Sequence, residues 1–337
     1  KSFIPPFIHR LPEPTGPIVQ TLAYALAAGL GSVGFLWTTH HLFDLLFTRH
    51  QNSAPTEFLL WSLSAIVLSS LLAGLLLWRF GREEAGSGIP QLKVAYWKNM
   101  GVVPRHSVWV KFLAGALTIG GGASLGREGP SVFIGGGLGA QVAGRLGQPR
   151  SACRAALSIG GAAALAAAFN TPLAGITFVL EEIIGNLNSR ILGRVVLASV
   201  VGAFTVHALI GSQPAFNVPT ILRPTWTVYV ILPLVAATAA AVGVLFQKMT
   251  LHRRERIRTQ SRLPIWMRPL CGALITWILG AAVFLATRRI GVFGLGYGDL
   301  SAALAANLEW KVAALLVLAK LLATESAYGW GGCGGIF

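Results

Sequence analysis

The chain has 337 residues, of which 54% are hydrophobic and only 12% carry a charge. Because soluble domains carry about 25% charged residues, this composition excludes a water-soluble enzyme, a disordered tail and a coiled coil. Only helices and closed barrels satisfy their backbone polar groups within lipid, and the strands of a barrel show short alternating runs. The apolar residues of this chain form long blocks instead, which predicts an all-α, polytopic membrane protein.

The charge balance is strongly basic, with 27 Lys and Arg residues against 12 Asp and Glu and a net charge of +15. Most basic residues lie between apolar blocks, as the positive-inside rule predicts. Nucleic-acid binding is the alternative, but the chain carries no recognition motif for it, so we expect no nucleic-acid partner. Part of the excess suits an anion pathway. The densest group is predicted to form a cytoplasmic loop and comprises Arg253, Arg254, Arg256, Arg258, Arg262 and Arg268.

Long apolar helices are predicted in the first and last parts of the chain. A helix that spans a hydrocarbon core about 30 Å thick needs about 20 residues. Residues 17–38 meet this requirement, with a pattern that continues toward residue 50, and so do residues 59–78 and 228–247. Two further apolar helices are predicted at 268–287 and 310–323.

The region between residues 86 and 211 differs, because its apolar stretches are short and interrupted by Gly and Pro. Helices are predicted at 90–99, 107–120, 130–146, 151–168, 172–186 and 191–210, and a loop at 214–224. Irregular backbone at membrane depth is tolerated only where it is buried in protein or lines a polar cavity. Broken helices of transporters point their N-terminal ends at anionic substrates. Most of the 40 glycines nevertheless suit close helix packing.

Three Gly-rich segments have the form of a loop that leads into a helix. They are Gly86-Ser87-Gly88-Ile89-Pro90, Gly126-Arg127-Glu128-Gly129-Pro130 and the terminal Gly334-Gly335-Ile336-Phe337. Proline favours the first helical turn, and the free N–H groups of that turn bind anions without a fixed cation. The hydroxyl of Ser87 adds a donor. We therefore expect an anion site that includes Ser87, Gly88, Ile89, Gly129 and Arg127, although Arg127 could equally stabilise the fold.

Glu128 is the sharpest single feature, because it lies between apolar runs at a predicted helix N-terminus. An ionised carboxylate there would compete with an anion for the same N–H groups, and protonation would release the site. This is a gate switched by one proton. The alternative is a plain salt bridge with Arg127. Ionisable residues within a membrane are functional by default, so we favour the gate.

Glu181 and Glu182 form an acidic pair after the apolar run 176–180. Adjacent residues on a helix point about 100° apart, so the pair is poorly placed to share a proton or bind one metal ion. A divided role is more natural, with one carboxylate on a proton path and the other paired with an arginine such as Arg190 or Arg194. The alternative is that both cap the cytoplasmic end of the helix.

Other chemistries find little support in the sequence. The segment Gly135–Ala140 loosely matches a dinucleotide fingerprint, but no strand precedes it. Cys153, Cys271 and Cys333 have no zinc or disulfide spacing, so no metal or other cofactor is predicted. An intramembrane hydrolase would need a Ser–His or paired-Asp constellation, which the pattern does not offer. We therefore expect a transport protein rather than an enzyme.

The motifs together resemble the CLC chloride channel and transporter family. They are the Gly86, Gly126 and Gly334 segments quoted above, Ala167-Ala-Phe-Asn-Thr-Pro-Leu-Ala-Gly175 and Glu181-Glu182, and they occur in the family's order and at similar spacing from about residue 17 to residue 337. The resemblance implies a single membrane domain over 1–337 with short, tilted, broken helices. It implies two inverted repeats, 17–211 and an incomplete 226–337, because the family motif continues into a proline and further helices.

The resemblance also implies the roles of individual residues. Ser87 would contact the central anion, Glu128 would be the external gating glutamate, and Glu182, the second of its pair, would be the internal proton glutamate. The backbone of Ile336 and Phe337 looks like the other half of the anion site. The implied assembly is a homodimer with one anion pathway per subunit, in a bacterial inner membrane.

The acid at position 182 bears on the mechanism. In this family an acid there is typical of proton-coupled exchangers, and many channels lack it. The combination of Glu128 and Glu182 therefore resembles a prokaryotic antiporter that exchanges chloride for protons, and Ser87 resembles the chloride-selective type. A passive, voltage- or pH-gated chloride channel of the same family is the alternative.

Overall fold

The computed structural model describes residues 15–187, 191–212, 216 and 226–336, and within them every named element is helical. In chain order the α-helices are α1 (Thr15–Leu46), α2 (Pro55–Phe80), α3 (Ile89–Trp97), α4 (Arg105–Gly120), α5 (Glu128–Arg145), α6 (Arg150–Phe169), α7 (Pro172–Phe178), α8 (Leu192–Leu209), α9 (Trp226–Gln260), α10 (Arg268–Thr287), α11 (Tyr297–Leu304) and α12 (Trp310–Gly329). Short 3₁₀ turns are η2 (Thr48–His50), η3 (Arg82–Glu84) and η5 (Ile265–Met267), and η4 (Val179–Ile184) is π-helical.

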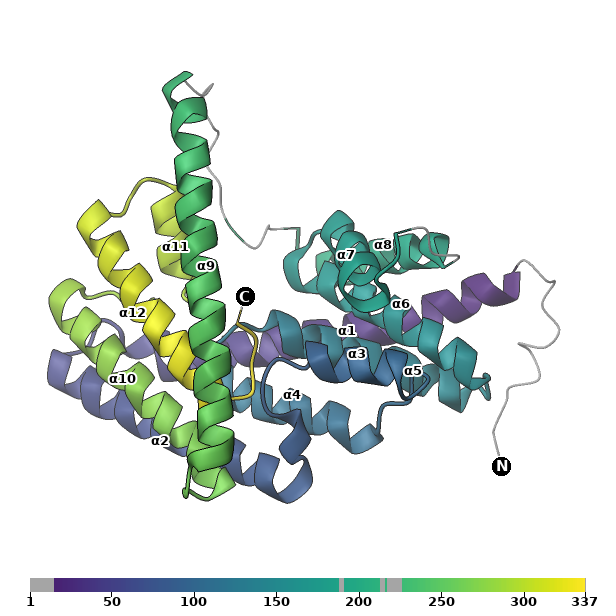
Figure 1. The fold of residues 1–337 in the computed structure, drawn as a ribbon, viewed down its shortest axis with the longest axis horizontal. Helices are drawn as coiled ribbons and strands as arrows, with labels where there is room; N and C mark the ends of the chain where they lie inside the picture. The colour runs from purple at the N-terminus through teal and green to yellow at the C-terminus, as the bar shows by residue number, and fades with distance from the viewer. Residues whose placement is uncertain (1–14, 188–190, 213–215, 217–225, 337) are drawn as a thin grey trace.

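The helices form two groups that meet at the centre of the molecule (Figure 1). In the first, α5 and α6 pack together and are covered by α1 and α8. Small residues allow this close approach: a Cβ at Gly139 would lie 2.5 Å from the Ala156 carbonyl oxygen, as in small-residue interfaces of membrane helices. In the second group, α10 packs against α2 and α12, and α9 packs against α12.

Seven helices of the described residues are long and apolar enough to cross a membrane. They are α1, α2, α6, α8, α9, α10 and α12, two of them extended by an adjoining 3₁₀ turn. The short helices α3, α7 and α11 lie between them in the chain, as predicted for a membrane protein with broken helices. The predicted all-α, polytopic fold is confirmed, and the chain is an integral, multi-pass membrane protein.

The predicted helix at 172–186 exists, but its hydrogen-bond pattern changes along its length. It begins as α7 and continues as the π-helical segment η4, which holds both Glu181 and Glu182. Single π-helical turns inside helices are frequent at functional sites. The loop predicted at 214–224 lies outside the described residues except for Phe216.

The predicted cytoplasmic loop around the arginine cluster is partly wrong, because α9 continues as a helix to Gln260. Arginine is a good helix former, so a run of charge does not end a helix by itself. Tertiary contacts also support the added turns: Arg253 Nε lies 2.5 Å from Glu325 Oε1 on α12, and Arg254 stacks over the Tyr328 ring at 4.6 Å. Only Arg262 lies in the connection to η5, and Arg268 begins α10.

Candidate anion-binding site

The three Gly-rich segments, separated by up to about 250 residues in the chain, meet at the junction of the two helix groups. Gly126 and Gly335 exchange two backbone hydrogen bonds, of 2.8 and 2.6 Å, as an isolated antiparallel bridge. The Gly86 N–H donates to the Gly332 carbonyl at 3.0 Å. The last segment thus runs between the other two, and the C-terminal end lies at the centre of the molecule in Figure 1.

The first two segments lead into helix N-termini, as predicted. Helix α3 begins at Ile89 after Gly88, whose left-handed backbone (φ 96°) requires a residue without a Cβ, and α5 begins at Glu128. Ser87 is buried, and its Oγ accepts a hydrogen bond from the Ile89 N–H at 3.4 Å. The hydroxyl hydrogen of Ser87 can therefore be donated to a ligand, beside the free N–H groups of the first turns.

The two helix starts approach closely at Gly129. A Cβ at Gly129 would lie 2.6 Å from the Ser87 carbonyl oxygen and 2.8 Å from the Ser87 Cβ. A Cβ at Gly335 would lie 3.4 Å from the Gly129 backbone nitrogen and 3.7 Å from Glu128 Oε2. Residues 87, 129 and 335, one from each segment, therefore lie together, with Glu128 at their edge.

We expect Gly129→Ala to lower chloride affinity at least about tenfold, because the added methyl group must push Ser87 away from the α5 N-terminus. Isothermal titration calorimetry on the purified protein would measure the change. Gly144→Ala on the same helix is the matched control, since nothing lies within 4 Å of a Cβ there. Equal chloride affinity in the two variants would contradict the assignment of residues 87 and 129 to one anion site.

Glu128 is 4% exposed and does not form the salt bridge with Arg127 that the sequence left open, as far as the described residues show. Its Oε1 accepts a hydrogen bond of 2.6 Å from the Tyr297 hydroxyl, and no described residue donates to its buried Oε2. The carboxyl group lines a cavity of about 1070 Å³ between α9, α11 and α12. Glu128 is thus buried from bulk solvent at the edge of this cavity.

Arg127 directs its guanidinium away from the other two segments. The group lies over the Tyr297 ring at 5.1 Å, and Nη2 donates to the Ala168 carbonyl at 3.4 Å. The side chain therefore supports the surroundings of Glu128, and the backbone of Arg127 forms the N-cap of α5.

Two cations and a thiol hold the loop in front of Ser87 in place. The fully buried Lys111 of α4 donates to the Glu84 carbonyl and, at 3.2 Å, to the Gly86 carbonyl. Arg254 Nη2 donates to the Ala85 carbonyl at 3.3 Å, and the Cys333 thiol donates to the Glu84 carbonyl at 3.5 Å. Burial raises the pKa of the Glu84 carboxyl, and the charge of Lys111, 3.8 Å away, opposes that rise.

The acidic pair of η4 lies apart from the three segments. Glu182 is exposed and pairs with Lys93 of α3 at 2.9 Å, while Glu181 is exposed beside it. The expected arginine partner is therefore wrong for Arg194, whose Nε donates to Thr21 Oγ1 instead, and Arg190 lies outside the described residues. A second contact, from Trp97 Nε1 to the Ile183 carbonyl at 3.1 Å, fixes η4 against α3.

Sequence reasoning missed Tyr297, which the structure places on Glu128. The short helix α11 that begins with Tyr297 was not predicted either. The signal was available, because Gly294 and Gly296 flank Leu295 directly before a helix start, and both have positive φ (54° and 74°). This is the same pattern of glycine before a helix N-terminus that singled out the other segments.

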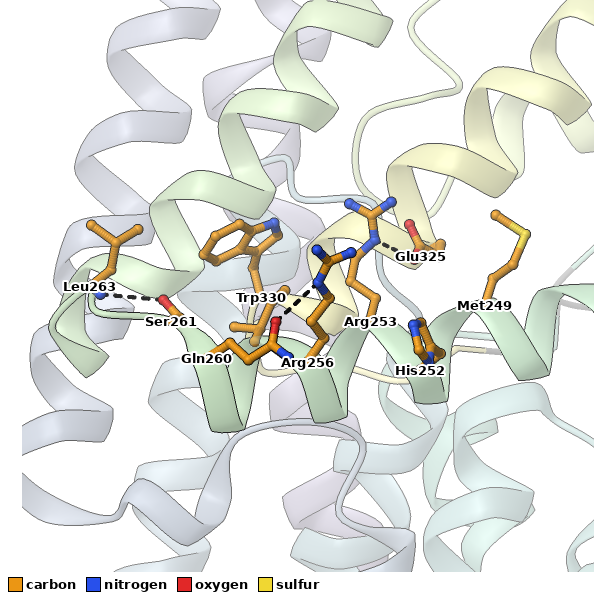
Figure 2. Close-up of a pocket in the computed structure, with 10 residues that line it drawn as sticks. Met249, His252, Arg253, Arg256, Gln260, Ser261, Leu263, Glu325 and Trp330 are labelled. Atoms are coloured by element: carbon orange, nitrogen blue, oxygen red, sulfur yellow. Dashed lines mark hydrogen bonds and ion pairs between the residues drawn. The ribbon is translucent and has the colours of Figure 1, made fainter.

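A second pocket, of about 610 Å³, lies between the last turns of α9 and the end of α12 (Figure 2). The Arg253–Glu325 ion pair crosses it, and Arg256 Nε donates to Gln260 at 3.2 Å. Glu325 is 1% exposed, so the pair buries one charge and joins the two helices. Of the candidate residues, Ile336 lines the larger cavity and not this pocket, and Phe337 lies outside the described residues.

Fold and site together define a class: a helical, multi-pass membrane protein whose Gly-rich segments meet beside a buried carboxyl group. The family model described as voltage gated chloride channel matches residues 69–337. The chain belongs to this family, and the resemblance noted from its motifs is confirmed.

Curated relatives include proteins named H(+)/Cl(-) exchange transporter ClcA. The one from Cronobacter sakazakii is 32% identical over 327 residues, which cover 92% of this chain and 67% of the relative. The one from Yersinia pseudotuberculosis is 32% identical over 344 residues, covering 98% and 70%. The one from Vibrio parahaemolyticus is 27% identical over 360 residues, covering 100% and 73%.

Solved structures show the same fold. A slow cyanobacterial Cl-/H+ antiporter superposes with a TM-score of 0.77 at 22% identity, covering 95% of this chain and 75% of that one. A CLC-type fluoride/proton antiporter superposes with a TM-score of 0.76 at 21% identity, covering 96% and 77%. At these identities the likeness establishes the fold alone.

Proposed function

We propose that this protein is a proton-coupled chloride antiporter, in which chloride crosses the membrane in one direction and protons in the other. The single observation that carries the proposal is the meeting of three Gly-rich segments around a buried carboxyl group that lines a cavity. The curated relatives are exchange transporters by name. Their names favour exchange over the passive, voltage- or pH-gated channel that the sequence left as the alternative.

The anion would lie where the segments converge. Ser87 offers a hydroxyl, and the backbones of Gly88, Ile89, Gly129 and Arg127 offer N–H groups at the starts of α3 and α5. Ile336 and Phe337 would complete the site from the terminal segment. Dipoles and neutral donors hold a halide weakly enough to release it, so the site suits transport and needs no cofactor.

Protons would enter and leave through two carboxylates. Glu128 is the gate: ionised, it competes with the anion for the first turn of α5, and protonated, it withdraws. Glu182 would supply protons from the other side, because it is exposed and is joined to α3, the helix that begins at the anion site, through Lys93. Proton and anion paths would then separate between the two acids.

The assembly and location follow from the family. We propose a homodimer with one anion pathway in each subunit, in the inner membrane. The proposal includes two inverted repeats, 17–211 and the incomplete 226–337, with α2 of the first packed against α10 of the second.

Uphill proton movement in liposomes tests the proposal directly. The intact protein is reconstituted with a chloride gradient, no pH gradient and the membrane potential held at zero with a potassium ionophore. Chloride flowing inward should drive protons outward, measured as alkalinisation of the lumen with an enclosed pH dye. Chloride flux without proton movement would identify a channel, and absence of both fluxes would contradict transport.

A further inference from the structure

Tyr297 makes the one hydrogen bond that the structure records to the carboxyl group of Glu128. Its hydroxyl lies 2.6 Å from Oε1, and it reaches there from the first residue of α11, 169 residues further along the chain. A phenol donates strongly to an ionised carboxylate, and such bonds are shorter and about twice as strong as bonds between neutral groups. The contact therefore holds the carboxyl group of Glu128 in its present position, and the bond is strongest to a carboxylate.

The tyrosine ring is itself held from two sides. Arg127 lies over its face at 5.1 Å, and Phe216 meets it edge-on at 4.8 Å between ring centres. A ring clamped in this way keeps its hydroxyl directed at Oε1 without losing further rotational freedom when the bond forms. Tyr297 thus has the properties of a preorganised donor.

The loop that carries Tyr297 is fixed by a lysine. Lys320 of α12 donates from Nζ to the Gly294 carbonyl at 2.5 Å and to the Val292 carbonyl at 3.4 Å. Asp299, two residues after Tyr297, pairs with Arg289 at 3.1 Å. The loop and the start of α11 are therefore anchored independently of Glu128, so the carboxyl group can leave while the tyrosine stays.

The charged and titratable groups around Glu128 come from three elements. They are Arg127 at the start of α5, Tyr297 and Asp299 on α11, and Lys320 on α12. Asp299 is paired with Arg289, which leaves Arg127 and Lys320 as the basic side chains near the carboxyl group. Within this set Tyr297 alone bonds to Glu128, which makes it the group whose removal changes the carboxyl group most directly.

We propose that Tyr297 is a positioning residue that latches ionised Glu128 over the anion site and releases it on protonation. The inference rests on the proposed function and adds to it the partner that sets the pH at which the gate opens. A protonated carboxyl group accepts a weaker hydrogen bond than a carboxylate. Uptake of a proton therefore loosens the latch, and the acid leaves the N-terminus of α5 to the anion.

The test is the pH dependence of chloride flux from liposomes containing Tyr297→Phe. Without the hydroxyl the blocked state loses its bond, so the pathway should open at a pH higher by about one unit, a tenfold change in the latch equilibrium. Tyr229→Phe on the exposed face of α9 is the matched control and should keep the wild-type profile. A wild-type profile for Tyr297→Phe would overturn the latch.

The double variant Tyr297→Phe with Glu128→Gln separates this inference from the proposed function. An amide carries no charge to latch, so the added Tyr297→Phe change should leave the profile of Glu128→Gln unaltered. A shift that persists in the double variant would show that Tyr297 acts on another group and would overturn the latch. Suppose that Tyr297→Phe keeps the wild-type pH profile while Glu128→Gln transports chloride independently of pH. This result would overturn the latch but leave the role of Glu128 as the gate intact.

A milder variant covers the case in which Tyr297→Phe does not fold. Phe216→Leu leaves the hydroxyl in place but removes the edge contact to the Tyr297 ring, so it should shift the profile in the same direction by a smaller amount. An opposite shift, or none, with folded protein would count against the latch.

Discussion

Glu128→Gln is expected to abolish proton movement while chloride continues to flow. The amide cannot carry a proton across the gate, and it lacks the negative charge with which the carboxylate competes for the α5 N-terminus. Proton transport should fall to the level of protein-free vesicles, and chloride flux should lose its dependence on pH. Parallel recordings of lumenal pH and released chloride from the same liposomes would measure both changes.

The control for this variant is Glu57→Gln. It removes an exposed acid in the first turn of α2, outside the three Gly-rich segments. It should transport both ions like the unchanged protein. Proton pumping that survives Glu128→Gln would remove Glu128 from the proton path. Loss of chloride flux as well would mean that the carboxyl group serves the fold and not the gate.

Glu182→Gln is expected to stop proton movement and spare chloride, because it removes a carrier of protons but no part of the anion site. A positioned proton-transferring side chain contributes about a hundredfold or more, so proton flux should fall by at least that factor. The ion pair with Lys93 is half exposed on both sides, and such pairs contribute at most about 1 kcal/mol. The variant should therefore fold normally, which keeps the transport result interpretable.

Glu181→Gln is the matched control, since it is an exposed neighbour on the same π-helical segment. The ion pair with Lys93 belongs to Glu182, and Glu181 should carry no protons. If Glu181→Gln stops proton movement and Glu182→Gln does not, the roles within the pair are exchanged. Unchanged proton flux in both variants would place the internal proton donor elsewhere.

The acidic pair also shows where sequence reasoning loses accuracy. The one-residue offset predicts different roles for the two carboxylates, and the structure shows both exposed, with Glu182 paired to Lys93. The pattern predicts that one carboxylate carries protons and that the other pairs with an arginine nearby in the chain, at 190 or 194. The structure instead pairs Glu182, the expected proton carrier, with Lys93, 89 residues away, because α3 packs against η4 and side chains pair with what lies beside them in space.

The arginine cluster and Tyr297 are two further cases in which tertiary contacts decide the outcome. A run of charge predicts a loop, yet α9 continues through it because Arg253 and Arg254 contact partners on α12. Tyr297 was not singled out, since a tyrosine in a short Gly-rich stretch has many ordinary roles. Its importance comes only from its contact with Glu128.

Local patterns in the sequence were enough to predict the class of the protein, the positions of its main helices and the three segments that meet beside Glu128. These properties depend on local chemistry: apolar length for spans, Gly and Pro for broken helices, and N–H groups at helix starts for anions. The tertiary structure alone decided that the segments meet and that Tyr297, Arg127 and Lys320 surround Glu128. Those outcomes depend on how distant helices pack, and no local pattern of residues encodes which side chains that packing brings together.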